Sequence, residues 1–152
     1  MEIIIDVLNF GTIEVELLKE YAPITVDNFL KLVNENYFEN SSFHRVIEGF
    51  MIQGGMGKTN ADSIKGEFSS NGVENNLKHT RGVISMARTM VRDSASSQFF
   101  IMHKDSPHLD HEYAAFGRVT SGIEVVDKIA AVKTNSYDAP IEPVIISSIK
   151  LK

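Results

Sequence analysis

Two short stretches, Phe43–Gly55 and Ser94–Ile101, contain the residues best suited to chemistry. Both have the composition of strands, in which large apolar side chains are mixed with neutral or cationic hydrogen-bonding groups. Residues two positions apart on a strand share a face, so Gln98 is predicted to share a face with Phe100. By the same rule, Arg45 points to the opposite face from the residue before it.

The chemistry of this surface follows from which groups it has and which it lacks. Met51 is predicted to share a face with Gln53, and Glu48, in the expected turn, is the only carboxylate of the two stretches. Neither stretch contains a thiol. A surface of arginine, glutamine, phenylalanine and methionine suits a neutral, partly apolar ligand and is poorly suited to bond cleavage.

The elements that would position these residues begin with a hairpin and a helix. Residues 12–17 alternate polar and apolar side chains, and Asn9-Phe10-Gly11 supplies a turn between them and the apolar run 3–7. Pro23 suits the first turn of a helix, and the apolar residues of 26–33 recur at helical spacing.

The second half of the chain predicts three more strands and a second helix. The strands are 83–86, 115–119 and 144–151, and residues 54–80 are polar and glycine-rich, which predicts a surface loop. Ser121 and Glu124 have capping-box spacing, followed by an apolar stripe over 125–130. Many short strands with two separated helices favour a β-barrel or sandwich closed by helices.

Length and composition limit the possible functions. A chain of 152 residues with 43% apolar residues is expected to form one globular domain over 1–152. The net charge of −5 argues against nucleic acid as a partner. No apolar run is long enough for a membrane span, and the N-terminus lacks the basic segment of a signal peptide. The absence of cysteine excludes disulfides and a thiol nucleophile, and is compatible with the cytoplasm.

Two nucleophile or phosphate motifs fail on inspection. Gly57-Lys58-Thr59 resembles the end of a phosphate-binding loop, but Ile52 stands where that motif needs a glycine. The serines at 94, 96 and 97 lack the flanking glycines of a nucleophile elbow. Neither site is predicted.

Three histidines, His103, His108 and His111, lie close together beside acidic residues. Their spacing matches no recognised zinc pattern. The preferred interpretation is therefore solvated loop residues, with a metal site as the alternative.

Long ordered strings of this chain closely resemble the cyclophilin family of peptidyl-prolyl cis–trans isomerases, in its compact, bacterial-like form. The resemblance extends over nearly the whole chain and is specific. It covers the 23–33 helix, Phe43–Gly55, Asn75–Arg88, Ser96–Ile101 and Phe116–Val119. It implies a mainly β fold: a closed eight-stranded antiparallel β-barrel capped by two α-helices.

The same resemblance implies an isomerase that rotates X–Pro peptide bonds of proteins, without cofactor or metal. Arg45 matches the catalytic arginine of the family. The resemblance also implies the substrate-binding residues. The apolar walls are Phe50, Met51, Phe100 and Leu109, and the flanking amides are Gln53 and Gln98. Ala87 and Arg88 form the segment that holds the peptide, and His108 and Tyr113 are two variable positions.

Two of these positions depart from the best-known family pattern. His108 stands where many members carry tryptophan, and Tyr113 where many carry histidine. In the family that tryptophan matters mostly for the inhibitor cyclosporin, so reduced cyclosporin affinity is expected. The expected partners are proline-containing segments of unfolded or folded proteins, in an assisting role in folding, and a monomer is the expected state.

A competing hypothesis is a proline-recognition module that holds its partner without turning the bond. Pure binding needs the aromatic walls but not the guanidinium. Arg45 is therefore the residue that distinguishes the two hypotheses.

Overall fold

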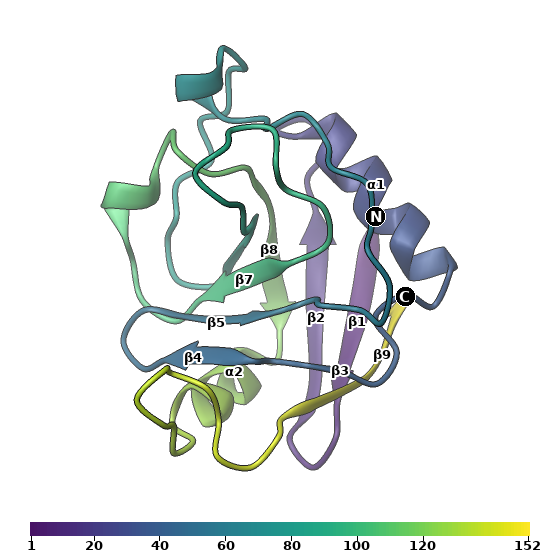
Figure 1. The fold of residues 1–152 in the computed structure, drawn as a ribbon, viewed down its shortest axis with the longest axis vertical. Helices are drawn as coiled ribbons and strands as arrows, with labels where there is room; N and C mark the ends of the chain where they lie inside the picture. The colour runs from purple at the N-terminus through teal and green to yellow at the C-terminus, as the bar shows by residue number, and fades with distance from the viewer.

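The computed structural model describes residues 1–152. It is a curled, mainly β structure with one helix toward each end (Figure 1). The strands are β1 Glu2–Val7, β2 Gly11–Leu17, β3 Ser41–Ser42, β4 Arg45–Ile47, β5 Met51–Gly54, β6 Val83–Met86, β7 Phe99–Met102, β8 Ala115–Ser121 and β9 Ile145–Leu151. The helices are α1 Pro23–Asn34 and α2 Ile123–Ala130, with short 3-10 turns η1 Ser69–Asn71 and η2 Pro107–Leu109. Neither helix has the length and apolarity to cross a bilayer.

The strands form one antiparallel sheet in the order β3-β9-β1-β2-β8-β6-β7-β5-β4. Its two edge strands, β3 and β4, are separated in the chain only by Phe43 and His44. One short segment therefore supplies both edges of the sheet, which accounts for the difference from the predicted eight strands. If residues 41–47 are counted as one bent strand, the count is eight and the order becomes circular.

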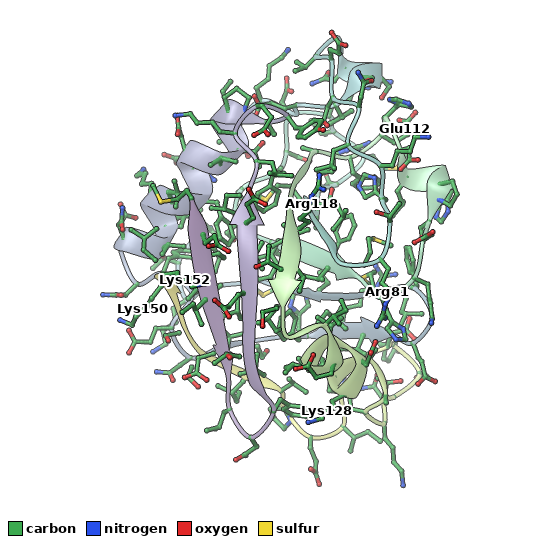
Figure 2. The ribbon with its side chains drawn as sticks, turned by 180° about the vertical axis from the view of Figure 1, so that it is seen from behind. Arg81, Glu112, Arg118, Lys128, Lys150 and Lys152 are labelled. Atoms are coloured by element: carbon green, nitrogen blue, oxygen red, sulfur yellow. The ribbon has the colours of Figure 1, made fainter.

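The predicted hairpin is confirmed as β1 and β2, with Ile5 opposite Ile13. Both side chains are fully buried on the inner face, as the alternation in the sequence requires. The outer face carries charge, and Lys152 pairs with Glu14 there at 2.7 Å (Figure 2).

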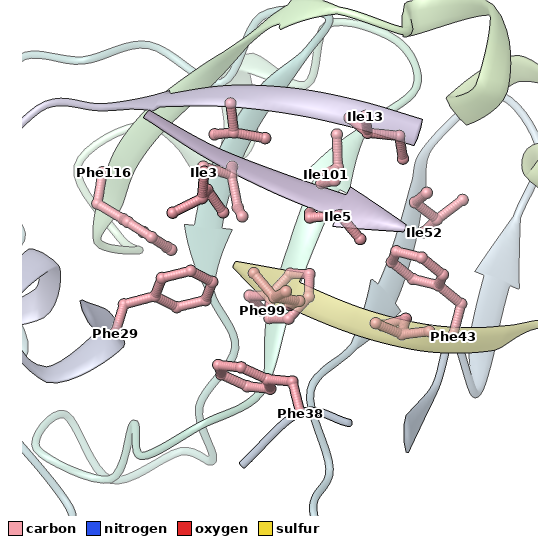
Figure 3. Close-up of a cluster of buried hydrophobic side chains, with 14 of the residues drawn as sticks. Ile3, Ile5, Ile13, Phe29, Phe38, Phe43, Ile52, Phe99, Ile101 and Phe116 are labelled. Atoms are coloured by element: carbon pink, nitrogen blue, oxygen red, sulfur yellow. The ribbon is translucent and has the colours of Figure 1, made fainter. Parts of the chain in front are cut away.

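The inner faces of the strands and helix α1 enclose the main core. Phe29 of α1 lies 5.6 Å from the ring of Phe99 and 5.3 Å from that of Phe116, edge-on and tilted respectively (Figure 3). A second apolar cluster contains Met51, Phe100 and Leu109 and belongs to the opposite face of β5 and β7. Strands β6 and β7 are buried along their whole length because both of their faces are covered.

Residues 54–80 are only partly the surface loop that the sequence predicts. Glu67, Phe68, Asn75 and His79 are each at most 3% exposed. Asn75 donates from Nδ2 to the carbonyls of Glu67 and Ala115, at 3.0 and 2.9 Å. Polar composition indicated exposure, but Glu67, Asn75 and His79 are buried because each has hydrogen-bond partners within the fold.

Glu67 also caps α1. Ala22, the N-cap residue, has no side chain able to accept a hydrogen bond. The Glu67 carboxylate takes over that role, because it accepts the backbone N–H groups of Ile24 at 3.1 Å and Thr25 at 2.6 Å. The Thr25 hydroxyl donates to it as well, at 2.7 Å. A buried negative charge at the positive end of the helix dipole is thus fully hydrogen-bonded.

We expect Glu67→Gln to lower the free energy of unfolding by about 1–3 kcal/mol. The amide nitrogen would face a backbone N–H, so that one buried donor loses its acceptor. Urea unfolding measures the loss, and Glu74→Gln, an exposed change on the same loop, is the control. Equal stability of the two variants would contradict the capping role.

The predicted capping box of the second helix is wrong. Ser121 is the last residue of β8, and α2 begins after Gly122 with no side-chain cap. Gly122 has φ +89°, and a Cβ there would collide with the backbone oxygen of Thr12. The tight passage from strand to helix therefore requires glycine, and its carbonyl accepts the N–H of Val125 at 2.9 Å.

Candidate active site

The pairing of four strands places a row of side chains on one face of the sheet. Arg45 of β4 lies opposite Gln53 of β5, Gln53 opposite Phe100 of β7, and Phe100 opposite Ser85 of β6. Residues paired in this way have side chains on the same face and within contact range. The register thus brings Arg45 and Phe100, which are far apart in the sequence, onto one short row.

Arg45, Gln53 and Phe100 of this row line a cavity of about 150 Å³. Nine of the residues that the sequence suggested line it: Arg45, Phe50, Met51, Gln53, Ala87, Arg88, Phe100, Leu109 and Tyr113. Met51, Phe100 and Leu109 are buried beneath it, whereas Arg45 is exposed at its rim. The volume suits one small ring better than a drug-sized ligand, for which pockets are larger.

Arg45 keeps its guanidinium free of carboxylates. It takes part in none of the salt bridges of the chain, although Arg81 and two lysines do. A cation without a counter-ion at the rim of an apolar cavity can donate hydrogen bonds to a ligand.

Gln98 lies outside the first cavity, and the predicted strand at 94–101 is shorter than expected. Only its last residues, with Met102, form β7, because Gly54 at the end of β5 pairs with Phe99 and the ladder stops there. Gln98 nevertheless accepts a hydrogen bond from Gln53 Nε2 at 3.1 Å. It lines a neighbouring polar cavity of about 240 Å³, which shares Gln53, Ala87 and Arg88 with the first.

His108 and Tyr113 have different positions. His108 is exposed and lies against the ring of Phe50, with centroids 5.8 Å apart, but does not line the cavity. Tyr113 does line it, edge-on to Phe100 at 5.7 Å. The Arg88 guanidinium packs between the rings of Tyr113 and Phe68, at 4.7 and 4.6 Å. Its cation–π contacts fix the outer wall of the cavity, a role that the sequence analysis missed.

The sequence analysis also missed a buried polar array behind Phe100. His79 Nε2 lies 2.9 Å from the Ser85 hydroxyl and its Nδ1 lies 3.2 Å from Asp110. The order of groups is that of a hydrolase triad, but Ser85 is completely buried and cannot reach a substrate. The imidazole stacks on Phe100 at 5.9 Å, so the array supports the cavity floor. A histidine within the mostly polar run 74–80 was the available signal.

Burial lowers the pKa of His79 below its ordinary value of 6.5, against the opposing effect of Asp110. Burial likewise lowers the pKa of His44. The folded chain therefore binds fewer protons than the unfolded chain near pH 6. The free energy of unfolding has its full value above about pH 6.5 and falls as the pH decreases through the lowered pKa values.

We expect this fall to appear in urea unfolding measured from about pH 7.5 to about pH 5. His79→Gln should flatten the slope, whereas His111→Gln, on the exposed loop, should leave it in place. A slope that survives His79→Gln unchanged would exclude His79 as its source.

The three clustered histidines are separated in the structure. The expectation of solvated loop residues is wrong for His103, which is 9% exposed and lies 3.1 Å from Asp127. His111 is exposed beside Ser69 at 3.1 Å, and His108 beside Phe50. No group of three or more histidine, aspartate or glutamate side chains gathers as a metal site would require.

The largest cavity lies elsewhere. It measures about 630 Å³ between the β1–β2 turn and residues 131–145. None of the residues suggested by the sequence lines it. The smaller cavity beside Arg45 is the candidate site because there a free cation, amides and a buried apolar floor converge.

Comparison with known proteins finds similar sequences and structures over nearly the whole chain. The family described as cyclophilin type peptidyl-prolyl cis-trans isomerase/CLD matches residues 2–151. A peptidyl-prolyl cis-trans isomerase of Acinetobacter baylyi is 46% identical over 95% of this chain and 82% of its own. Isomerase B of Escherichia coli is 40% identical over 93% of this chain and 94% of its own. A Cryptosporidium parvum cyclophilin-type isomerase, solved in the presence of the dipeptide Ala-Pro, has a TM-score of 0.90 and 30% identity over 100% of this chain and 99% of its own.

Proposed function

Because this chain belongs to the cyclophilin-type peptidyl-prolyl cis–trans isomerase family, we propose that Arg45 and the cavity beside it are where it turns X–Pro peptide bonds. The chain is an isomerase by this membership. We propose that residues 1–152 act as one domain. The main core supports this, since it combines Ile3 near one end of the chain with Ile149 near the other.

The reaction has a barrier of about 18–20 kcal/mol, because resonance gives the C–N bond double-bond character. Uncatalysed isomerisation takes tens of seconds or longer. An acceleration of about 10⁵-fold requires the site to favour the twisted state by about 7 kcal/mol. No covalent bond breaks, so neither a nucleophile nor a cofactor is needed.

Arg45 supplies the contact that differs between the flat and twisted states. In the twisted state the proline nitrogen becomes pyramidal and gains a lone pair, to which a guanidinium N–H can donate. The planar amide offers that donor almost nothing, so the hydrogen bond acts on the transition state. One charge-assisted hydrogen bond contributes about 1.5–3 kcal/mol, which is less than the whole acceleration requires.

The remaining stabilisation of the twisted state comes from contacts that hold the substrate and from the exclusion of water around the bond. Phe50, Met51, Phe100 and Leu109 grip the pyrrolidine ring, while the backbone of 87–88 holds the residue before it. One side of the bond can then rotate against the other. Exclusion of water further disfavours the more polar planar amide.

The observation that carries this proposal is an exposed, unpaired Arg45 at the rim of a buried apolar cavity of about 150 Å³. Exchange NMR of an Ala-Pro peptide tests it. Exchange cross-peaks between the cis and trans signals at catalytic protein concentrations, lost on addition of a competing proline peptide, are expected. Binding without exchange would instead indicate the proline-recognition module, which needs the walls but not the guanidinium.

We propose proline-containing protein segments as substrates, with a role in protein folding. The Ala-Pro dipeptide of the Cryptosporidium parvum structure supports this choice. We propose weak cyclosporin binding because His108 stands where many members carry tryptophan, and the smaller ring offers less apolar area. We also propose that the protein is a monomer and that it is located in the cytoplasm. The lack of cysteine supports this compartment.

A further inference from the structure

The turn between β4 and β5 carries Phe50, one wall of the candidate site, and its Gly49 has no side chain to pack. The Phe50 N–H donates to the Ile47 carbonyl at 3.0 Å, which closes the turn. Gly49 has φ +83° and is exposed, and no atom lies within 4 Å of where its Cβ would be. The backbone of Gly49 therefore depends on hydrogen bonds from another element for its position.

His103, the residue after β7, provides those contacts. Its Nδ1 accepts the backbone N–H of Gly49 at 2.9 Å. Its own backbone N–H donates to the Phe50 carbonyl at 2.9 Å. One buried residue thus binds two successive positions of the turn, from its side chain and from its backbone.

The role of Nδ1 as an acceptor determines the tautomer. The ring proton must be on Nε2, which lies 3.1 Å from Asp127 Oδ1 and donates to it. Asp127 is on α2, so the imidazole connects the turn to this helix.

Arg81 holds the far end of this connection. It donates to both carboxylate oxygens of Asp127, at 2.6 and 2.8 Å, and to the His103 carbonyl at 3.1 Å. Figure 2 shows Arg81 beside the helix that carries Lys128. Hydrogen bonds from Arg81 lower the pKa of Asp127, which keeps the carboxylate an acceptor for the imidazole. The ring of His103 is therefore held at both of its nitrogens.

We propose that His103 is a positioning residue for isomerisation, which fixes the Gly49–Phe50 turn and thereby the wall against which the proline ring packs. The proposal rests on the candidate site described above. Arg45 lies at the other end of β4 and is held by its pairing with Gln53, independently of the turn. Loss of the His103 side-chain contact should therefore weaken substrate binding and leave the turnover rate nearly unchanged.

Two amide substitutions test the hydrogen bonds of the two ring nitrogens of His103 separately. His103→Asn places a carbonyl oxygen near the position of Nδ1, where it can accept the Gly49 N–H but cannot reach Asp127. His103→Gln places its amide near the position of Nε2, where it can donate to Asp127 but leaves the Gly49 N–H without an acceptor. We expect His103→Gln to raise KM about 5–10-fold and to keep kcat within about twofold of the wild-type value. His103→Asn should keep both KM and kcat within about twofold of their wild-type values.

Amide hydrogen exchange of Gly49 is the second readout. Although Gly49 is exposed, its N–H should be protected in the wild type and in His103→Asn, and unprotected in His103→Gln. Fast exchange in the wild type would overturn the proposal even if a variant failed to fold. Equal KM values for the two variants would overturn it as well.

The wild-type exchange experiment on the Ala-Pro peptide distinguishes this proposal from the proposed function. If the wild type binds without catalysing exchange, the function fails. The Kd of the peptide for the two variants then still tests whether His103 positions the wall.

Discussion

Replacing Arg45 by alanine is expected to lower kcat/KM for an Ala-Pro peptide by about 10²–10³-fold, the effect of losing one preorganised donor at a developing charge or lone pair. The fold should survive, because Arg45 is exposed and pairs with no carboxylate of the chain. A protease-free isomerisation assay measures the rate. The loss should fall mainly on kcat, since the hydrogen bond is made only in the twisted state.

Two variants control this result. Arg45→Lys keeps the charge but loses the planar fork, so most of the rate should be lost. Arg118→Ala removes a positive charge from the exposed face of β8 and should leave the rate unchanged (Figure 2). If Arg45→Ala isomerises the peptide at the wild-type rate, Arg45 has no part in the mechanism.

Replacing Phe100 by alanine is expected to weaken substrate binding and also to destabilise the fold by about 3–5 kcal/mol. Phe100 is 5% exposed and is packed between His79 and Tyr113, at centroid distances of 5.9 and 5.7 Å. It forms part of the cavity floor, so its loss removes the apolar area against which the proline ring would pack, up to about 3 kcal/mol. Peptide titration and urea unfolding measure the two losses separately.

The adjacent residue is a matched control. Phe99 is on the same strand, is completely buried, and faces the main core on the other side of the sheet. Phe99→Ala should cost about as much stability while leaving peptide affinity unchanged. The milder pair Phe99→Leu and Phe100→Leu repeats the comparison if the alanine variants unfold. If the Phe100 variants bind the peptide with unchanged affinity, Phe100 belongs to the core and not to the substrate pocket.

Much of the fold could be predicted from local patterns. Period-two alternation located β2, the apolar run before it located β1, and helical spacing with Pro23 located α1. These predictions succeeded because each element buries a continuous face, and burial imposes its periodicity on the sequence. The predicted capping box of α2 was wrong although its spacing was correct. Ser121 is the last residue of β8 and so belongs to the sheet, not to the helix cap.

The candidate site could be predicted only in part from the sequence. The residue types around Arg45 predicted a neutral, apolar ligand, and resemblance to a family supplied the individual roles. The sequence could not show that Gln98 lies beyond the end of β7, because a strand ends where its partner ends. It also could not show that His103 is buried, since its partners Gly49 and Asp127 are remote in the chain.

By itself, the sequence determined which side chains can share a face, since a strand alternates its side chains whatever surrounds it. Only the tertiary structure decided which faces meet. The register Arg45–Gln53–Phe100–Ser85 joins strands from distant segments, and the loop of residues 54–80 buries Glu67 and His79 against them. Such pairings depend on the free energy of the whole packed sheet and not on any local segment, so no local pattern specifies them.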